Sequence, residues 1–172
     1  MLTARGMDDD VTVSNFLSGS FETVSPFCFA DMEEAAFTVG EAVDFGEKIC
    51  IYGDYDCDGV TSTALLLSYL RSEGADVFAY IPDREGEGYG LNKDAIDTIK
   101  ERGAKLIITV DNGISSVDEA EYIYSLGMRL VITDHHQLGD TLPRAEAVVN
   151  PHREENDLTF REYCGVGVAF KL

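Results

Sequence analysis

The sequence predicts an α/β fold in which a parallel β-sheet is flanked by helices on both faces. Short runs that are apolar throughout, such as KLIITV at residues 105–110, alternate with segments of helical periodicity. Strands without polar alternation are typical of parallel sheets that are buried on both sides. The predicted strands cover residues 48–52, 76–81, 105–110, 128–133 and 145–150, and the predicted helices between them cover residues 61–72, 92–101 and 116–126.

The first 45 residues predict a lead-in segment that precedes the main domain of residues 46–172. Residues 1–30 have no clear period and predict irregular structure, whereas residues 31–45 carry apolar side chains at helical spacing and predict a helix. Large apolar residues in the irregular part indicate that it packs onto a larger body. They are Phe16, Leu17, Phe21, Phe27 and Phe29.

The last eight residues, GVGVAFKL at 165–172, predict the first turns of an apolar helix. No capping residue, glycine or proline ends this helix, although domain boundaries are usually exposed and polar. The main domain is therefore expected to be truncated at its C-terminal end.

Charge and cysteine content limit the function and the location of the protein. The chain has 32 acidic and 13 basic residues and a formal net charge of -19. Nucleic-acid-binding proteins usually carry a basic patch, so either the partner is not a nucleic acid, or a metal and another part of the protein supply the positive charge. The four cysteines have no C-x-x-C spacing, and the chain shows neither a signal peptide nor a membrane-length apolar run. We expect a cytoplasmic protein that does not bind membranes.

Three acidic loops follow three of the predicted strands. They have the sequences GDYDCDG at residues 53–59, DNG at residues 111–113 and DHH at residues 134–136. The carboxyl ends of parallel strands meet at one edge of the sheet, which is where such folds bind ligands. Seven candidate site residues are expected to gather there: Asp54, Asp56, Asp58, Asp111, Asp134, His135 and His136.

So many carboxylates cannot remain ionised side by side without a counter-charge. Carboxylate oxygens and imidazole nitrogens suit Mn²⁺ or Mg²⁺ better than metals that prefer thiolates. Two such ions close together are a standard device for the hydrolysis of phosphate esters. The three loops together therefore predict a two-metal-ion hydrolase.

Each loop alone has a simpler interpretation. A single aspartate after a strand, such as Asp111, is most often a turn former or a helix N-cap. The spacing of Asp54, Asp56 and Asp58 is also that of half a calcium-binding loop, although an apolar helix replaces the glutamate that should close it. Cys57 is expected to fill space inside its loop and not to act as a nucleophile.

The three loops, in this order, resemble the first three motifs of the DHH phosphoesterases, which are named after the Asp-His-His sequence. Further segments resemble the RecJ-type exonucleases of that superfamily, among them IYGDYDCDGVTSTALL from Ile51, YIPDREGEGYGLN from Tyr80 and CGVGVAFKL from Cys164. The resemblance covers nearly the whole chain. It implies a DHH domain and a metal-dependent phosphodiesterase that degrades single-stranded DNA from 5' to 3' in recombination and repair.

The resemblance also implies a role for each site residue. Asp54, Asp56 and Asp58 would hold two Mn²⁺ or Mg²⁺ ions, Asp111 would bridge them and His135 would bind one of them. His136 would bind a metal or the scissile phosphate, and Asp134 would orient the histidines. The loop of residues 84–92 would lie near the DNA strand.

A fourth acidic motif and a second, basic lobe of the family are absent from this chain. The resemblance therefore implies that the complete protein is a monomer that binds single-stranded DNA through this lobe, and that residues 1–172 alone have little activity. Two alternatives remain open. One is a DHH enzyme that acts on oligoribonucleotides, cyclic dinucleotides or pyrophosphate, and the other is a non-catalytic relative that keeps the fold.

Overall fold

Five parallel strands form the centre of the computed structural model, which describes residues 2–19, 23–83 and 90–172. The strand order is β2-β1-β3-β4-β5, so the direction in which strands are added reverses between β1 and β3. Sheets of this kind bind ligands at that switch point. The prediction of a parallel sheet is confirmed. The strands are β1 (Ile49–Tyr52), β2 (Val77–Tyr80), β3 (Leu106–Val110), β4 (Arg129–Thr133) and β5 (Ala147–Val149).

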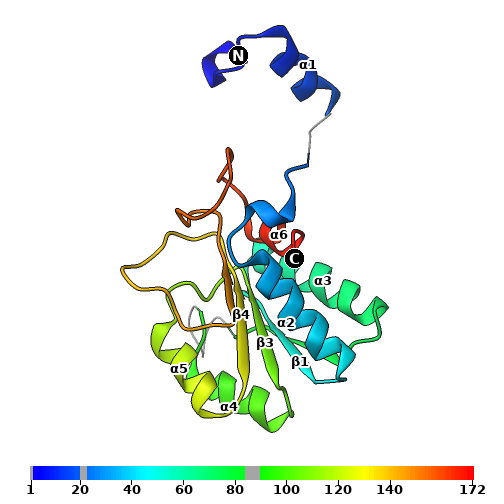
Figure 1. The fold of residues 1–172 in the computed structure, drawn as a ribbon, viewed down its shortest axis with the longest axis vertical. Helices are drawn as coiled ribbons and strands as arrows, with labels where there is room; N and C mark the ends of the chain where they lie inside the picture. Colours follow the sequence, from blue (N-terminus) through cyan, green and yellow to red (C-terminus); the bar gives the residue numbers. More distant parts are fainter. Residues whose placement is uncertain (1, 20–22, 84–89) are drawn as a thin grey trace.

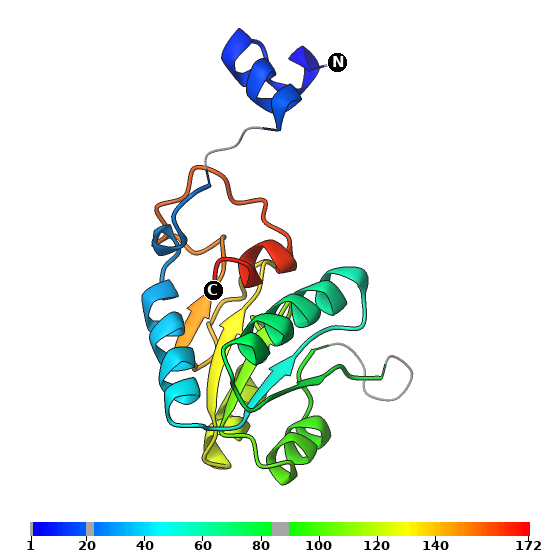
Figure 2. The same ribbon diagram turned by 90° about the vertical axis from the view of Figure 1, so that its right-hand side faces the viewer.

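Helices cover both faces of the sheet, as Figures 1 and 2 show. Successive side chains of a strand point to opposite faces, so Ile107 and Ile108 of β3 belong to different cores. The core that contains Ile108 is shared with α2 (Met32–Asp44), α3 (Cys57–Ser72) and α6 (Gly165–Ala169). The core that contains Ile107 is shared with α4 (Lys93–Glu101) and α5 (Val117–Ser125). Burial of one such isoleucine stabilises the fold by about 1.5–3 kcal/mol.

The N-terminal segment differs from the prediction. Residues 1–30 were expected to be irregular, but they contain helix α1 (Asp10–Ser18) and two short 3₁₀ helices, η1 (Thr3–Arg5) and η2 (Pro26–Cys28). Helix α1 begins where it does because the Asp9 carboxylate accepts a hydrogen bond from the N–H of Thr12 at 2.8 Å. Asp9 is therefore the N-cap of α1, and Asp10 is the first residue of the helix.

The expected packing of this segment is wrong for three residues. Phe16, Leu17 and Phe27 are exposed, and none of the residues of α1 is buried. Figure 1 shows α1 apart from the sheet and its helices. Phe29 is buried as expected, because it lies next to α2 in the core, and Phe21 lies outside the described residues.

A buried arginine joins α2 to the last strand of the sheet. The Arg153 guanidinium donates hydrogen bonds to Asp31 Oδ2 and, at 2.7 Å, to the carbonyl oxygen of Val148. Asp31 Oδ2 also accepts the N–H of Val148 at 3.1 Å, and the Asn156 side chain accepts the N–H of Ala30 at 2.7 Å. We call Asp31, Val148, Arg153 and Asn156 the Arg153 cluster. Because α2 shares a core with the sheet, residues on both sides of the predicted boundary at residues 45 and 46 pack together, and the boundary itself stays a prediction.

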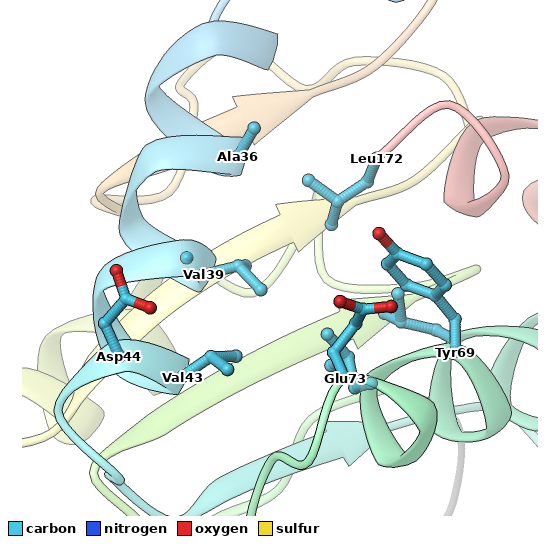
Figure 3. A pocket seen from close by; sticks show the side chains of 10 residues that line it. Ala36, Val39, Val43, Asp44, Tyr69, Glu73 and Leu172 are labelled. Carbon is cyan, nitrogen blue, oxygen red and sulfur yellow. The ribbon is translucent and has the colours of Figure 1, made fainter.

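A groove of about 310 Å³ lies between α2 and α3. Figure 3 shows Val39 and Val43 of α2 on one side, Tyr69 of α3 and the following C-cap residue Glu73 on the other, and Leu172 beside them. None of the helices in the described part of the chain has the length and apolar character that a membrane span requires.

Candidate metal centre at the carboxyl end of the sheet

The three acidic loops meet at one edge of the sheet. Asp111 directly follows β3, Asp134 directly follows β4, and Asp54 comes two residues after β1. These strands are neighbours, and the three aspartates are only 1–3% exposed. We call the seven predicted site residues together the acidic cluster: Asp54, Asp56, Asp58, Asp111, Asp134, His135 and His136.

The loop after β1 is shorter than the sequence suggested. Helix α3 begins at Cys57 and not at residue 61, because the Asp56 carboxylate caps it by accepting the N–H of Gly59 at 2.9 Å. The predicted start of this helix was therefore wrong by one turn. Gly59 allows the turn to close tightly, since a Cβ on this residue would lie 2.6 Å from the backbone nitrogen of Asp54. Asp54 Oδ1 accepts the N–H of Tyr55 at 2.7 Å.

Asp58 lies in the first turn of α3 and faces the beginning of α6. Its Oδ2 accepts the N–H of Gly165 at 2.6 Å, and its Oδ1 accepts the N–H of Val166 at 2.8 Å. The same Oδ2 lies 3.6 Å from His135 Nε2. Asp58 thus connects the acidic cluster to α6, and its role as a metal ligand stays a prediction.

Asp111 has an unusual backbone and an unusual carboxylate. Its φ of 62° lies in the left-handed region, which aspartate tolerates better than most residues. The N-cap of α5 is Ser116, so Asp111 does not cap that helix. Its Oδ1 is buried and has no hydrogen-bond partner among the described residues, although His135 Nε2 lies 3.0 Å away without the alignment of a hydrogen bond.

The electrostatic environment of Asp111 disfavours its charged form. Burial is the main cause, and the carboxylates of Asp58 and Asp56 add to it, so the pKa of Asp111 rises to about 7. At neutral pH this carboxyl group is therefore only partly ionised when no cation is nearby. A cation bound beside it would stabilise the ionised form and so oppose both causes of the shift.

Asp134 holds the loop that carries the two histidines. Its Oδ2 accepts the N–H of Ile114 at 2.9 Å, and its Oδ1 accepts the N–H groups of His135 and His136 and lies 2.7 Å from His136 Nδ1. Burial opposes ionisation of Asp134, but the hydrogen bonds from His136 and Ile114 outweigh it and lower its pKa. The same contact raises the pKa of His136. Metal-binding histidines are commonly oriented by such a carboxylate.

The described residues of the acidic cluster fit a divalent cation. Potential ligand atoms of Asp111, His135 and His136 lie within 4.8 Å of one another, and so do those of Asp54, Asp56 and Asp111. Asp111 belongs to both groups, and its buried Oδ1 has no hydrogen bond that a cation would have to displace. Oxygen and imidazole donors are those that Mn²⁺ and Mg²⁺ accept.

Sequence reasoning did not single out two residues that support the site. The Asn112 side chain donates to the carbonyl oxygen of Val110 at 3.0 Å and to that of Tyr52 at 3.4 Å, and so joins β3 to β1 beside Asp111. The fully buried Asn150 donates to the carbonyl oxygen of His136 at 3.0 Å. Its position at the end of a predicted strand was an available signal. Of the predicted DNA-contacting loop at 84–92, residues 84–89 lie outside the described residues.

Comparisons with known proteins agree with this geometry. Residues 48–172 match the model of the DHH family, N-terminal domain. The chain is 47% identical over 173 residues to the single-stranded-DNA-specific exonuclease RecJ of Bacillus subtilis, covering 100% of this chain and 22% of that protein. It is 45% identical to the Escherichia coli protein of the same description over 142 residues, covering 82% of this chain and 25% of the relative.

Solved structures give the same picture. The structure described as exonuclease RecJ bound to manganese has a TM-score of 0.78 at 36% identity, covering 87% of this chain and 38% of that one. RecJ of Thermus thermophilus in complex with Mn²⁺ has a TM-score of 0.66 at 28% identity, covering 99% and 25% of the two chains. The chain thus spans about a quarter of the length of the curated relatives it matches.

Proposed function

The chain belongs to the DHH family, and from this premise we propose that it is the metal-binding part of a single-stranded-DNA-specific exonuclease that hydrolyses phosphodiester bonds. One observation carries the proposal. Asp111 places a buried carboxylate oxygen without a hydrogen bond between two sets of potential ligands. The relatives described above supply the substrate class, because both curated proteins are single-stranded-DNA-specific exonucleases.

We assign the ligands to two divalent cations, Mn²⁺ or Mg²⁺. Asp54, Asp56 and Asp111 would hold one ion, and Asp111, His135 and His136 would hold the other, with Asp58 at the border of the cluster. When bound, the ions would activate a water molecule as nucleophile and neutralise the charge on the phosphoryl oxygens. Asp111, the residue common to both groups, would help to hold both ions.

The remaining residues have orienting roles in this proposal. Asp134 is buried, fixes the backbone of the histidine loop and holds the His136 ring through Nδ1. The side chain of His136 is 46% exposed, so it can meet either a metal or the scissile phosphate at the open side of the cluster. Asp134 and His136 are therefore the pair that we assign to catalysis beyond metal binding.

The negative charge of the chain indicates that other parts of the complete enzyme bind the DNA. With a net charge of -19, this part repels a polyanion, so single-stranded DNA would be held by other, basic parts of the complete enzyme. We propose that the complete protein is a cytoplasmic monomer that acts from 5' to 3' in recombination and repair. Residues 1–172 alone would have little activity.

A chimeric enzyme tests this function directly. Residues 1–172 would replace the aligned segment of the Bacillus subtilis relative, which is 47% identical to this chain. We expect the chimera to release nucleotides from 5'-phosphorylated single-stranded DNA in the presence of Mn²⁺, and the same chimera with Asp111→Ala to be inactive although folded. A folded chimera that degrades only oligoribonucleotides or cyclic dinucleotides, or that keeps full activity with Asp111→Ala, would refute the proposal.

A further inference from the structure

A glycine at the beginning of α6 lies between two carboxylates of the acidic cluster. The N–H of Gly165 donates to Asp58 Oδ2 at 2.6 Å. A Cβ on Gly165 would lie only 2.4 Å from Asp111 Oδ1 and 2.6 Å from Asp111 Cγ. Cβ atoms essentially never come within 3.0 Å of another group. The backbone of Gly165 is thus in direct contact with the Asp111 carboxylate.

Lack of space for a side chain, and not the backbone conformation, explains why residue 165 is a glycine. Gly165 is the first residue of α6 and is not among the glycines with a positive φ. Alanine is a better helix former than glycine, so the helix itself would accept alanine at this position. The close approach of Asp111 is what leaves no room for a side chain.

The same helical turn also holds the second carboxylate. The N–H groups of Gly165 and Val166 bind the two oxygens of Asp58, which lies in the first turn of α3, 107 residues before Gly165 in the chain. Hydrogen bonds from two backbone N–H groups fix the orientation of this carboxylate. The beginning of α6 therefore sets the positions of Asp58 and Asp111 relative to each other.

We propose that Gly165 is a positioning residue of the metal centre, and that its missing side chain is required for divalent cations to bind tightly. The proposal rests on the proposed function, because it assumes that the acidic cluster binds metal. An alanine at this position would push against the Asp111 carboxylate, which is common to both groups of potential ligands. Disturbance of residues that support metal ligands typically weakens metal binding by about 10- to 100-fold.

Gly167 provides a matched control in the same helix. A Cβ on Gly167 would lie 3.4 Å from Tyr163 Cδ1 and 3.5 Å from Cys164 Sγ, which are ordinary contacts. Calorimetry with Mn²⁺ would compare the wild-type chain with Gly165→Ala and Gly167→Ala, and thermal unfolding in EDTA would report the fold of each. We expect Mn²⁺ binding about tenfold weaker or worse for Gly165→Ala, and unchanged binding for Gly167→Ala.

The outcomes separate this inference from the function on which it rests. Wild-type chain that binds no Mn²⁺ would overturn the metal centre itself. Equal affinity of the wild type and a folded Gly165→Ala variant would overturn only the role of Gly165.

If Gly165→Ala does not fold, a titration of the wild type with Mg²⁺ decides. The amide NMR signals of Gly165 and Val166 should then shift, whereas that of Gly40 on α2 should not. Signals of Gly165 and Val166 that stay in place at saturating Mg²⁺ would contradict the proposal.

Discussion

Asp31 and Asp111 have the same backbone conformation in opposite electrostatic surroundings. Their φ angles are 59° and 62°, and they are the two non-glycine residues with positive φ in the described part of the chain. Asp31 forms an ion pair with Arg153 and accepts the N–H of Val148. Asp111 lies among other carboxylates and has one buried oxygen without a hydrogen bond.

The difference separates a residue that stabilises the fold from one that is held ready for a ligand. Left-handed aspartate costs on the order of 1 kcal/mol in either place. At Asp31 the contacts within the Arg153 cluster offset this cost. At Asp111 the buried Oδ1 has no hydrogen bond that could offset it, and backbone strain of this kind is typical of functional sites. The matched substitutions Asp31→Asn and Asp111→Asn should therefore act in opposite directions, since asparagine also tolerates this conformation.

The largest effect is expected for Asp111→Asn without metal. The folded pKa of Asp111, about 7, is raised above the ordinary value of 3.8. Its contribution to stability is therefore complete below pH 4 and is lost as the pH rises through 7. Above pH 7 wild type has lost about 4 kcal/mol of stability in this way, whereas Asp111→Asn, which has no ionisable group here, loses none. Urea unfolding in EDTA should show Asp111→Asn to be more stable than wild type at pH 8.

The pH dependence is the sharper part of this prediction. The stability gap between Asp111→Asn and wild type should widen by about 2–3 kcal/mol between pH 5 and pH 8, because only the wild type loses a proton at this position. A gap that does not change with pH would mean that Asp111 is ionised throughout this range. In that case the surroundings of Asp111 would not disfavour its charged form, and the electrostatic difference from Asp31 would be refuted.

Addition of Mn²⁺ should close most of the stability gap between wild type and Asp111→Asn at pH 8. A ligand that binds only the folded state stabilises it by about 2.7 kcal/mol at 100 times its dissociation constant. For a chain of this size that corresponds to a rise in the melting temperature of roughly 5–10 °C. Wild type and Asp31→Asn should both show this rise in thermal scans with Mn²⁺, and Asp111→Asn should show little or none. Equal rises in all three proteins would place the metal elsewhere.

A smaller effect of opposite sign is expected for Asp31→Asn. The change removes the charge that Arg153 contacts and weakens a charge-assisted hydrogen bond. Because the Asp31 side chain is 38% exposed, the loss of stability should be only about 1–2 kcal/mol. Urea unfolding measures it, and Mn²⁺ calorimetry on the same variant should give the wild-type affinity. A variant as stable as wild type would show that the ion pair contributes nothing net.

Most of the helices and strands could be predicted from local sequence patterns. Ile107 and Ile108 lie in a run that is apolar throughout, which signals a strand buried on both faces, and glycines mark the helix ends. The beginning of α3 was harder to predict, because Asp56, interpreted from the sequence as a metal ligand in a loop, also serves as the N-cap of the helix. Helix α1 was missed because residues 1–30 show no clear apolar period, although Asp9 is a possible cap and does cap the helix.

The acidic cluster was predictable from position, but its internal roles were not. Loops that follow neighbouring parallel strands must meet, so the gathering of Asp54, Asp111 and Asp134 could be expected. That Asp58 faces α6, and that Gly165 touches Asp111, are consequences of tertiary packing over more than fifty residues of separation. No local pattern carries such information. Likewise, the partner that distinguishes Asp31 from Asp111 is Arg153, 122 residues away from Asp31 in the chain.

The smallest effect is expected for Cys57→Ser, next to the acidic cluster in the chain. Cys57 lies between Asp56 and Asp58, yet its side chain is exposed, and it is not among the residues that form the two potential ligand groups. If the cluster binds hard cations through oxygen and imidazole, this change should alter the Mn²⁺ affinity by less than about twofold. Calorimetry of wild type and Cys57→Ser with Cd²⁺, which prefers thiolates, provides the contrast. Tighter Cd²⁺ binding by wild type than by Cys57→Ser, together with weaker Mn²⁺ binding by Cys57→Ser, would show that the thiol is a metal ligand. The site would then contain a soft sulfur donor beside the carboxylate of Asp111, and the inference of a site built only from oxygen and imidazole donors would be wrong.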